Sequence, residues 1–250
     1  MKVGLFGFGR AGKAVATVLL QSEETDLCWV VRKSKNLQHR SVSEFLGITH
    51  DNQGIIFSKD EWTPQRLFDE HPVAVIIDFS SSDAILSYGK EAAKRGIAIV
   101  TAISAYPAET VALLKTLSRK TRVLWSPNIT VGINFLMMAA KTLKTIAPYT
   151  DIEVIEEHFK NKKEVSGTAI KISESLSLLH TDIKSVRVGG IVGRHEIIFG
   201  FPYQTVRLIH ESIQREAFGN GALFAAKTLV DRKKGFYSME NLLIPYFNLK

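Results

Sequence analysis

The chain has few of the features that mark secreted or membrane proteins. It has one cysteine, Cys28, in 250 residues, so it can form no internal disulfide, and the apolar run around Cys28 favours a buried, inert thiol. No apolar stretch reaches the roughly 20 residues that a membrane span needs. The chain starts with a strand-like segment rather than a secretory signal. We therefore expect a cytoplasmic protein with no membrane partner.

The charge balance indicates anionic partners. The chain has 32 Lys and Arg residues against 25 Asp and Glu residues, which gives a formal net charge of +7. The basic residues form short, separate clusters, and no nucleic-acid-binding module is recognisable, so we expect a small anionic ligand and no nucleic acid. The seven histidines show no metal-ligand spacing, so no metal site is expected.

The first half of the chain alternates strand-like and helix-like segments. Such alternation is typical of an α/β protein with a Rossmann-type, doubly wound parallel sheet. The strands of residues 73–78 and 97–101 are continuously apolar, as strands covered on both faces must be. Ser80 and Asp83 have the spacing of a capping box before a helix. The expected strands are 2–6, 26–31, 73–78, 97–101 and 123–125, with helices at 10–21, 82–95 and 108–118.

The pattern changes after residue 127. A long helix over 131–146 precedes a strand over 152–158, a polar loop and a helix over 167–179. Three β-like runs follow closely, which indicates an open, partly antiparallel sheet and hence a C-terminal α+β domain with a mixed sheet. These runs are 185–192, 195–199 and 204–210, and a last helix is expected over 221–230.

A glycine-rich turn lies between the first strand and the first helix. The sequence Gly7-Phe8-Gly9-Arg10-Ala11-Gly12 fits the pattern G-x-G-x-x-G. Glycines are required where the turn is tight, where the backbone approaches a pyrophosphate, and where the helix packs on the strand, while the helix N-terminus faces the anion. The motif in this context predicts dinucleotide binding.

The end of the second strand predicts which dinucleotide is preferred. An acid at this position would bind a free ribose 2′-hydroxyl, whereas a base would bind a 2′-phosphate. Here the strand ends in Arg32 and Lys33. A guanidinium offers a planar, permanently charged fork for a phosphate, so we expect NADPH to be preferred over NADH. The alternative is that both charges are merely solvated.

A second group of chemically capable residues lies between 156 and 169. His158 ends a strand, Lys162 and Lys163 follow in a loop, and Ser166-Gly167-Thr168 opens a helix. A helix N-terminus can hold a carboxylate, a lysine adds charge or a proton, and a histidine titrates near neutral pH. Taken alone, the segment could equally be a basic surface loop followed by a capped helix.

This segment resembles the E-H-H-x-x-K-x-D-x-P-S-G-T-A motif of the dihydrodipicolinate reductase family. Other motifs of that family occur in the same order along the whole chain, which makes the set far more specific than any one of them. They are Asp78-Phe79-Ser80, the segment from Asn128 to Asn134, the segment from Arg187 to His195, and Phe218-Gly219-Asn220-Gly221-Ala222.

The resemblance implies NAD(P)H-dependent reduction of 4-hydroxy-tetrahydrodipicolinate, or dihydrodipicolinate, to tetrahydrodipicolinate in diaminopimelate and lysine biosynthesis. It also implies a homotetramer that binds a small dicarboxylate. The expected domains are a nucleotide domain of residues 1–127, completed by 219–250, and a substrate-binding and oligomerisation domain of residues 128–218. His158 is implied as the acid/base residue and Lys162 as the proton donor.

The resemblance also assigns binding residues. The implied cofactor-binding residues are the glycine motif with Phe8, Arg10 and Ala11, then Arg32, Lys33, Phe79, Thr101, Ala102, Ile103, Ser126, Pro127, Asn128 and Ile129. The implied substrate-binding residues are Phe159, Lys163, Ser166, Gly167 and Thr168.

The chain departs from the family pattern at several points. Phe159 replaces the second histidine of the motif, one residue and the proline before Ser166 are missing, and the segment 170–186 is short. Two alternatives therefore stay open: a related reductase that acts on another imine or amino acid, and a non-catalytic dinucleotide-binding regulator. The missing residue also leaves open whether Lys162 or Lys163 is the donor.

Overall fold

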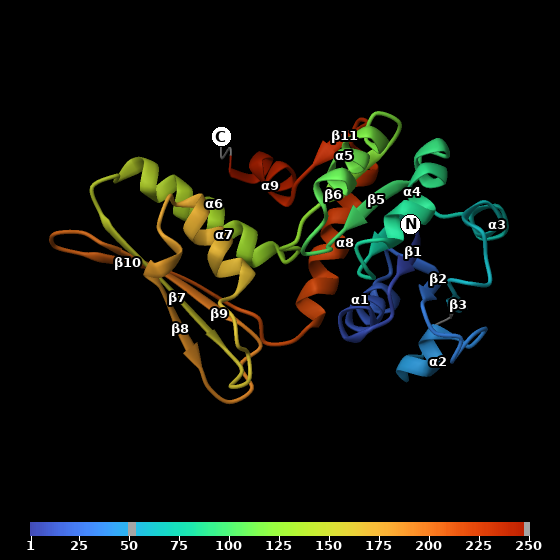
Figure 1. Ribbon diagram of the computed structural model, residues 1–250, viewed down its shortest axis with the longest axis horizontal. Coiled ribbons are helices and arrows are strands. Elements are labelled where there is room, and N and C mark those ends of the chain that lie inside the picture. The colour runs from blue at the N-terminus through green and yellow to red at the C-terminus, as the bar shows by residue number, and fades with distance from the viewer. Residues whose placement is uncertain (50–53, 248–250) are drawn as a thin grey trace. The chain divides into compact units, whose positions relative to one another are not determined.

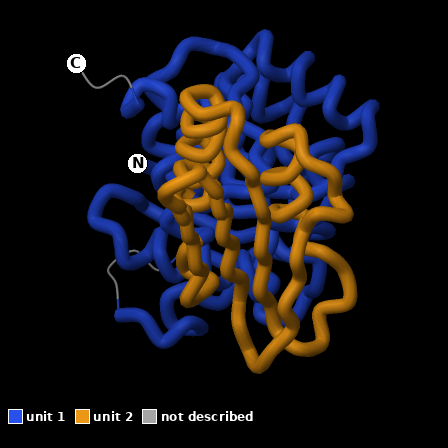
Figure 2. Tube along the Cα trace, turned by 90° about the vertical axis from the view of Figure 1, so that its left-hand side faces the viewer, with its two compact units in different colours: residues 1–130, 218–250 blue, residues 131–217 orange. Residues whose placement is uncertain are grey.

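The chain divides into two compact units, which are described separately. The computed structural model describes residues 1–49 and 54–247. Unit 1 comprises residues 1–130 and 218–250, and unit 2 comprises residues 131–217 (Figures 1 and 2). The second unit is thus an insertion between the first 130 residues and the last 33.

Unit 1 is built on a seven-stranded sheet in which every neighbouring pair is parallel. The strand order is β11-β6-β5-β4-β1-β2-β3, so the order along the chain reverses beside β1. All the strands therefore end at the same edge of the sheet. They are β1 (Lys2–Phe6), β2 (Asp26–Arg32), β3 (Ile55–Ser58), β4 (Val75–Asp78), β5 (Ala98–Thr101), β6 (Arg122–Trp125) and β11 (Gly235–Tyr237).

Helices cover both faces of this sheet. Apolar residues of α3, α4 and α5 pack on one face of the sheet. Outside this cluster, α1 packs against α8, where Val18 and Ala14 of α1 approach Gly219 of α8. This arrangement confirms the expected doubly wound α/β fold. The helices are α1 (Arg10–Gln21), α2 (Val42–Leu46), α3 (Pro64–Glu70), α4 (Ala84–Lys94), α5 (Ala108–Leu117), α8 (Glu216–Val230) and α9 (Met239–Phe247).

Aromatic rings fill the core under α3 and α4. The rings of Phe6 and Tyr88 stack with their centroids 4.2 Å apart, and Trp29 meets Phe6 edge-on at 5.4 Å. Trp29 is fully buried, and its indole N–H donates to the carbonyl oxygen of His71 at 3.0 Å. The core thus buries large rings without leaving this indole N–H unpaired.

Two glycines shape the turn between β1 and α1. Gly7 has a φ of 97°, and a Cβ built there would lie 2.5 Å from the carbonyl oxygen of Phe79. A Cβ at Gly12 would lie 2.1 Å from the carbonyl oxygen of Gly7. Both positions therefore exclude a side chain, because the obstructing atoms belong to the backbone.

Unit 2 is a four-stranded mixed sheet with two helices. The strand order is β10-β9-β7-β8, with β7 parallel to β8 and the other two pairs antiparallel. Residues of α6 and α7 join those of the sheet in one apolar core. The expected open, mixed sheet is confirmed. The elements are α6 (Val131–Ile146), β7 (Asp151–His158), α7 (Gly167–Ser175), β8 (Ile183–Arg187), β9 (Arg194–Gly200) and β10 (Thr205–Glu211), with a 3-10 turn at His180–Asp182.

Three expectations about local structure were incomplete or wrong. The short elements α2, β3, β11 and α9 were not expected, since each strand is only three or four residues long and its pairing comes from distant strands. The capping box was wrong: Ser80 donates to Asp78 instead, and α4 begins only at Ala84. The helix over 167–179 ends early, and Ser177 has a positive φ of 52° beyond it.

The glycine turn generates a stability prediction. We expect Gly12→Ala to lower the free energy of unfolding by at least about 1–3 kcal/mol, because the new methyl group meets backbone atoms that cannot move aside. Gly9→Ala is the matched control. No described atom lies within 4 Å of its added Cβ, so its cost should stay below about 1 kcal/mol, the scale of a helix N-cap change. Thermal unfolding followed by circular dichroism measures both, and equal losses would contradict the packing argument.

Candidate functional site

The residues expected to bind a dinucleotide all lie at the carboxyl edge of the unit 1 sheet. Gly7 follows β1, Arg32 ends β2, Phe79 follows β4, Thr101 ends β5, and Ser126 follows β6. These five strands are adjacent in the sheet. Parallel pairing therefore brings together segments that are up to 120 residues apart in the sequence, at the edge where open α/β sheets bind ligands.

Helix α1 begins directly at the glycine turn. Gly9 occupies its N-cap position and has no side chain to accept the first helical N–H groups. Gly9 and Arg10 are exposed, whereas Phe8 and Gly12 are buried and Ala11 is half-buried. A helix N-terminus of this kind offers backbone donors and a positive dipole end to an anion.

A buried carboxylate braces the turn after β4. Asp78 is fully buried and accepts hydrogen bonds from the backbone N–H of Ser80 at 2.9 Å and from the hydroxyl of Tyr88 at 2.7 Å. Burial raises the pKa of Asp78, while the bonds from Ser80 and Tyr88 oppose the rise. Because the Phe79 carbonyl faces Gly7, this carboxylate positions the wall of the glycine turn.

Hydrogen bonds connect the loops after β4, β5 and β6. The N–H of Ala102 donates to the backbone carbonyl oxygen of Asp78, and the N–H of Ser126 donates to that of Thr101, both at 3.0 Å. The indole of Trp125 donates to the carbonyl oxygen of Ile103 at 2.9 Å. The Ser126 hydroxyl donates to the carbonyl of Asn128 at 2.7 Å, beyond Pro127, and Ile129 is buried next to them.

A basic group lies at the ends of β2 and β3. Arg32 is half-buried and donates to the carbonyl oxygen of Asn36 at 3.1 Å, and Lys33 and Lys59 are exposed. Lys59 was missed by sequence reasoning because it follows β3, although the apolar run from Ile55 to Phe57 was a usable signal. The pKa of Asp83 is lowered mainly by a hydrogen bond from Ser81, with smaller contributions from Lys59 and Lys33.

A separate polar cluster lies in unit 2, at the end of β7. The Glu156 carboxylate is fully buried and contacts the Nδ1 of His158, which is 8% exposed. The carboxylate also accepts hydrogen bonds from the Ser185 hydroxyl at 2.6 Å and from Arg187 at 2.5 Å. Burial is the largest influence on the pKa of His158 and lowers it, while Glu156 raises it in part.

His195 joins this cluster from β9. Its ring lies edge-on to that of His158, with the centroids 5.4 Å apart, and its Nε2 lies 3.0 Å from the hydroxyl oxygen of Ser166. Burial, with the nearby His158 and His210, lowers the pKa of His195 to about 3. His195 is therefore neutral near pH 7. The family motif from Arg187 to His195 was the signal for this residue, but it was not among the predicted site residues.

Ser166 begins the helix that carries the expected carboxylate-binding residues. It is the N-cap of α7, and its hydroxyl accepts hydrogen bonds from the N–H groups of Thr168 and Ala169 at 3.2 and 3.3 Å. Gly167 is exposed, and no described atom lies within 4 Å of a Cβ built on it. The open space in front of Gly167 leaves room for a ligand at this helix N-terminus.

The two lysines in the loop between β7 and α7 differ in their exposure to solvent. The Lys162 side chain is half-buried, and its charge lowers the pKa of both His158 and His195. Lys163 is exposed, and so is Phe159, with 43% of its surface accessible. The Lys162 charge therefore acts on both histidines, and the Lys162 backbone is held by Arg187, whose guanidinium also bonds Glu156 beside His158.

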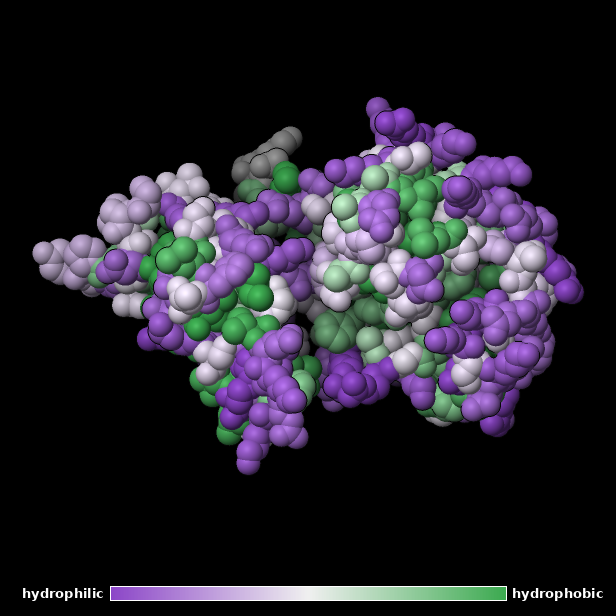
Figure 3. Space-filling model, viewed as in Figure 1, coloured by the Kyte–Doolittle hydropathy of each residue, from purple (hydrophilic) through white to green (hydrophobic). Residues whose placement is uncertain are grey.

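Among residues 1–49 and 54–247, no three metal-ligating side chains stand close enough to hold a metal ion. Within the same ranges, no helix has the length and apolar character to cross a bilayer. Figure 3 shows apolar patches interspersed with hydrophilic residues on the visible face of both units.

Two family models together match almost the whole chain. The model described as "Dihydrodipicolinate reductase, N-terminus" matches residues 1–129, and "Dihydrodipicolinate reductase, C-terminus" matches residues 129–243. The resemblance inferred from the motifs is therefore confirmed over both halves.

Individual relatives agree with these models. The 4-hydroxy-tetrahydrodipicolinate reductase of Caldanaerobacter subterraneus is 35% identical, with 68% of this chain and 76% of the relative covered. The enzyme of the same name from Nitratidesulfovibrio vulgaris is 27% identical over 94% and 95%. In fold, the dipicolinate-bound dihydrodipicolinate reductase of Paenisporosarcina matches with a TM-score of 0.78 at 20% identity, covering 96% of this chain and 98% of the other. The chain belongs to the dihydrodipicolinate reductase family and is an NAD(P)H-dependent oxidoreductase.

Proposed function

We propose that the chain reduces 4-hydroxy-tetrahydrodipicolinate, or dihydrodipicolinate, to tetrahydrodipicolinate in the pathway to diaminopimelate and lysine. The observation that carries this proposal is the grouping of His158, Lys162 and the N-terminus of α7 at one end of the unit 2 sheet, in a chain whose two halves both match the family. A cytoplasmic location belongs to the same proposal.

The proposed substrate is a small dicarboxylate. The solved relative from Paenisporosarcina holds dipicolinate, and a diaminopimelate dehydrogenase of similar fold, from C. glutamicum, holds DAP. In this chain the backbone of Gly167 and Thr168 would hold one carboxylate at the start of α7, with Ser166 fixing the helix end. Lys163 adds positive charge, and Phe159 offers an exposed ring to the substrate.

The residues of the unit 1 edge fit a nicotinamide dinucleotide. The turn from Gly7 to Gly12 leaves the start of α1 without a capping side chain and with open space at Gly9, which suits a pyrophosphate. Further binding contacts are proposed at Phe79, Thr101 to Ile103, and Ser126 to Ile129. When bound, the dinucleotide supplies the hydride. We propose that NADPH is preferred, because Arg32 ends β2, where a base would bind a 2′-phosphate, and Lys33 and Lys59 are exposed beside it in the chain or by strand pairing.

The proton transfers are assigned to His158 and Lys162. Reduction of a conjugated imine leaves an electron-rich carbon that must be protonated. Lys162 would donate this proton, since its ammonium can also stabilise developing negative charge. The lowered pKa of His158 keeps its ring neutral near pH 7, with Nδ1 protonated towards Glu156. Its Nε2 can then accept and relay a proton.

Two further proposals concern the identity of the substrate and the oligomeric state. Phe159, in place of the motif's second histidine, favours a second candidate function, a related imine or amino-acid reductase with another substrate. Assembly as a homotetramer is proposed from the family resemblance, and the surface we propose for it is the sheet face of unit 2 opposite its helices, where Val186 and Ile209 are 41% and 52% exposed. Equilibrium sedimentation measures that assembly, and a monomeric mass at micromolar concentration would exclude it.

A direct assay tests the function. Purified protein is mixed with dihydrodipicolinate prepared in situ, and the loss of NADPH and NADH absorbance is followed separately. Turnover with this substrate is expected. Turnover with another cyclic imine alone would favour the second candidate, and dinucleotide binding without turnover of any imine would overturn the proposal.

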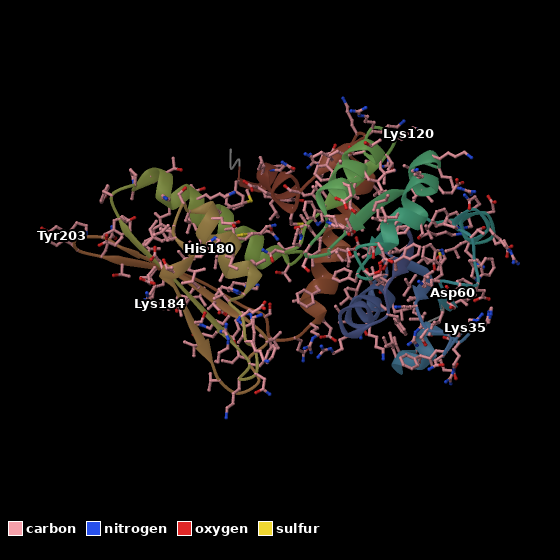
Figure 4. The ribbon with its side chains drawn as sticks, in the orientation of Figure 1. Lys35, Asp60, Lys120, His180, Lys184 and Tyr203 are labelled. Carbon is pink, nitrogen blue, oxygen red and sulfur yellow. The ribbon has the colours of Figure 1, made fainter. Side chains whose placement is uncertain are left out.

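Arg32→Asp tests the cofactor preference. A charge-assisted bond to phosphate contributes about 1.5–3 kcal/mol, so NADPH affinity should fall about tenfold to a hundredfold, while NADH affinity changes little. Lys35→Asp makes the same charge change at an exposed residue of the same loop (Figure 4) and should affect NADPH much less. Isothermal titration measures both. Equal losses for the two cofactors would show that Arg32 does not bind the 2′-phosphate.

Lys162→Ala and Lys163→Ala test the proton donor. General acid catalysis typically contributes about 10²–10⁴-fold, so Lys162→Ala should lower kcat by that factor with unchanged NADPH affinity. Lys163→Ala should mainly raise KM, because Lys163 is exposed and would act only through its charge. If Lys162→Ala lowered kcat only slightly and Lys163→Ala abolished activity, Lys163 would be identified as the donor.

A further inference from the structure

The fully buried Glu156 and the half-buried Arg187 form an ion pair that contacts both proposed proton carriers. The Glu156 carboxylate is 0% exposed, and one of its oxygens faces the Nδ1 of His158. Its other oxygen accepts hydrogen bonds from Arg187 at 2.5 Å and from Ser185 at 2.6 Å. The register of β7 and β8 explains this geometry, because Glu156 lies opposite Ser185 and His158 lies opposite Arg187.

The same guanidinium also holds the loop that carries Lys162. The Nε of Arg187 donates to the carbonyl oxygen of Lys162 at 2.9 Å, and its Nη2 donates to the carbonyl oxygen of Glu164 at 2.9 Å. The two carbonyl groups that accept these bonds belong to the residues immediately before and after Lys163. A planar group with five donors in a fixed fork can make such contacts together, whereas a lysine ammonium cannot reproduce their geometry.

We propose that Glu156 and Arg187 are positioning residues that couple the two proton carriers. Glu156 selects the His158 tautomer with the proton on Nδ1, and so leaves Nε2 as the acceptor. Arg187 orients that carboxylate and fixes the backbone from which Lys162 projects. This inference rests on the roles proposed above for His158 and Lys162.

The charges around His158 support a specific pH effect. Glu156 on its own strand raises the pKa of His158, while Lys162 in the loop and Arg187 on β8 lower it. On β9, His195 has its pKa lowered to about 3 and therefore remains neutral at pH values near 7. Burial of His158 disfavours its charged form, so loss of the Glu156 charge lowers the pKa of His158 further.

Glu156→Gln tests the first half of the proposal. The variant keeps the size of the side chain, and we expect kcat to fall at least about tenfold, with NADPH affinity unchanged. Nitrogen-15 NMR of the His158 ring should show loss of the pure Nδ1–H tautomer and a titration midpoint at lower pH. Glu157→Gln is the control on the next residue of β7, where the carboxylate pairs with Arg194 instead, and it should leave the His158 ring signals and kcat unchanged.

Arg187→Lys tests the second half of the proposal, the role of Arg187 in holding the loop. It also keeps the proposal testable if Glu156→Gln does not fold. If Arg187 acts through the loop, Lys162→Ala should cost a smaller factor in kcat in the Arg187→Lys background than in the native chain. Equal factors in both backgrounds would overturn the coupling. An unchanged His158 tautomer and midpoint in Glu156→Gln would overturn the role of the carboxylate. Because the NMR measurement needs no substrate, it separates this inference from the assay of the proposed function.

Discussion

Parallel strand pairing is the constraint on which the organisation of unit 1 depends. In a parallel sheet every strand ends at the same edge, so the residues after β1, β2, β4, β5 and β6 meet there regardless of their distance in sequence. The pairing also forces crossover helices onto the faces, which explains why the central residues of these strands are apolar. The close approach of Gly12 to Gly7 then brings the start of α1 down onto the same edge. A dinucleotide site follows from this geometry with few specialised side chains.

Unit 2 differs from unit 1 because it buries several charged and polar side chains at one end of its sheet. Its sheet ends in a carboxylate, a guanidinium and two imidazoles that are largely excluded from water. Burial alone would raise the pKa of Glu156, but hydrogen bonds from Arg187, Ser185 and His158 outweigh it, and the pKa is lowered. Such groups are costly to bury unless each one is paired. The pairing of Glu156 with Arg187, Ser185 and His158 fixes the orientation of a side chain to which a proton transfer is proposed.

The sequence predicted the strand-helix alternation because apolar continuity and glycine spacing are local signals. It also led to the proposed site segment from His158 to Thr168, since these residues are close together in the chain. Sequence signals for Lys59 and His195 existed, but they could not show which residues lie beside these two, because that depends on β3 pairing with β2 and on β9 pairing with β7. Ser80 shows a similar limit. Its spacing from Asp83 fits a capping box, but the buried Asp78 is a stronger acceptor nearby, and the helix start moves accordingly.

The shortened loop before α7 is compatible with an intact proton-transfer site. When Lys162 is matched to the lysine of the family motif, the chain has one residue fewer between that lysine and Ser166. Arg187 holds the carbonyl groups of Lys162 and Glu164, so the loop up to Glu164 is fixed from β8. Ser166 is fixed independently, by capping α7 and by its contact with His195. A deletion between these two anchored points would fall near Val165 and would keep the spacing from His158 to Lys162 that the proposed donor role requires. In the proposed site, the departure that would bear on the substrate is therefore Phe159, which stands where the family motif has a titratable ring and offers no hydrogen-bonding group.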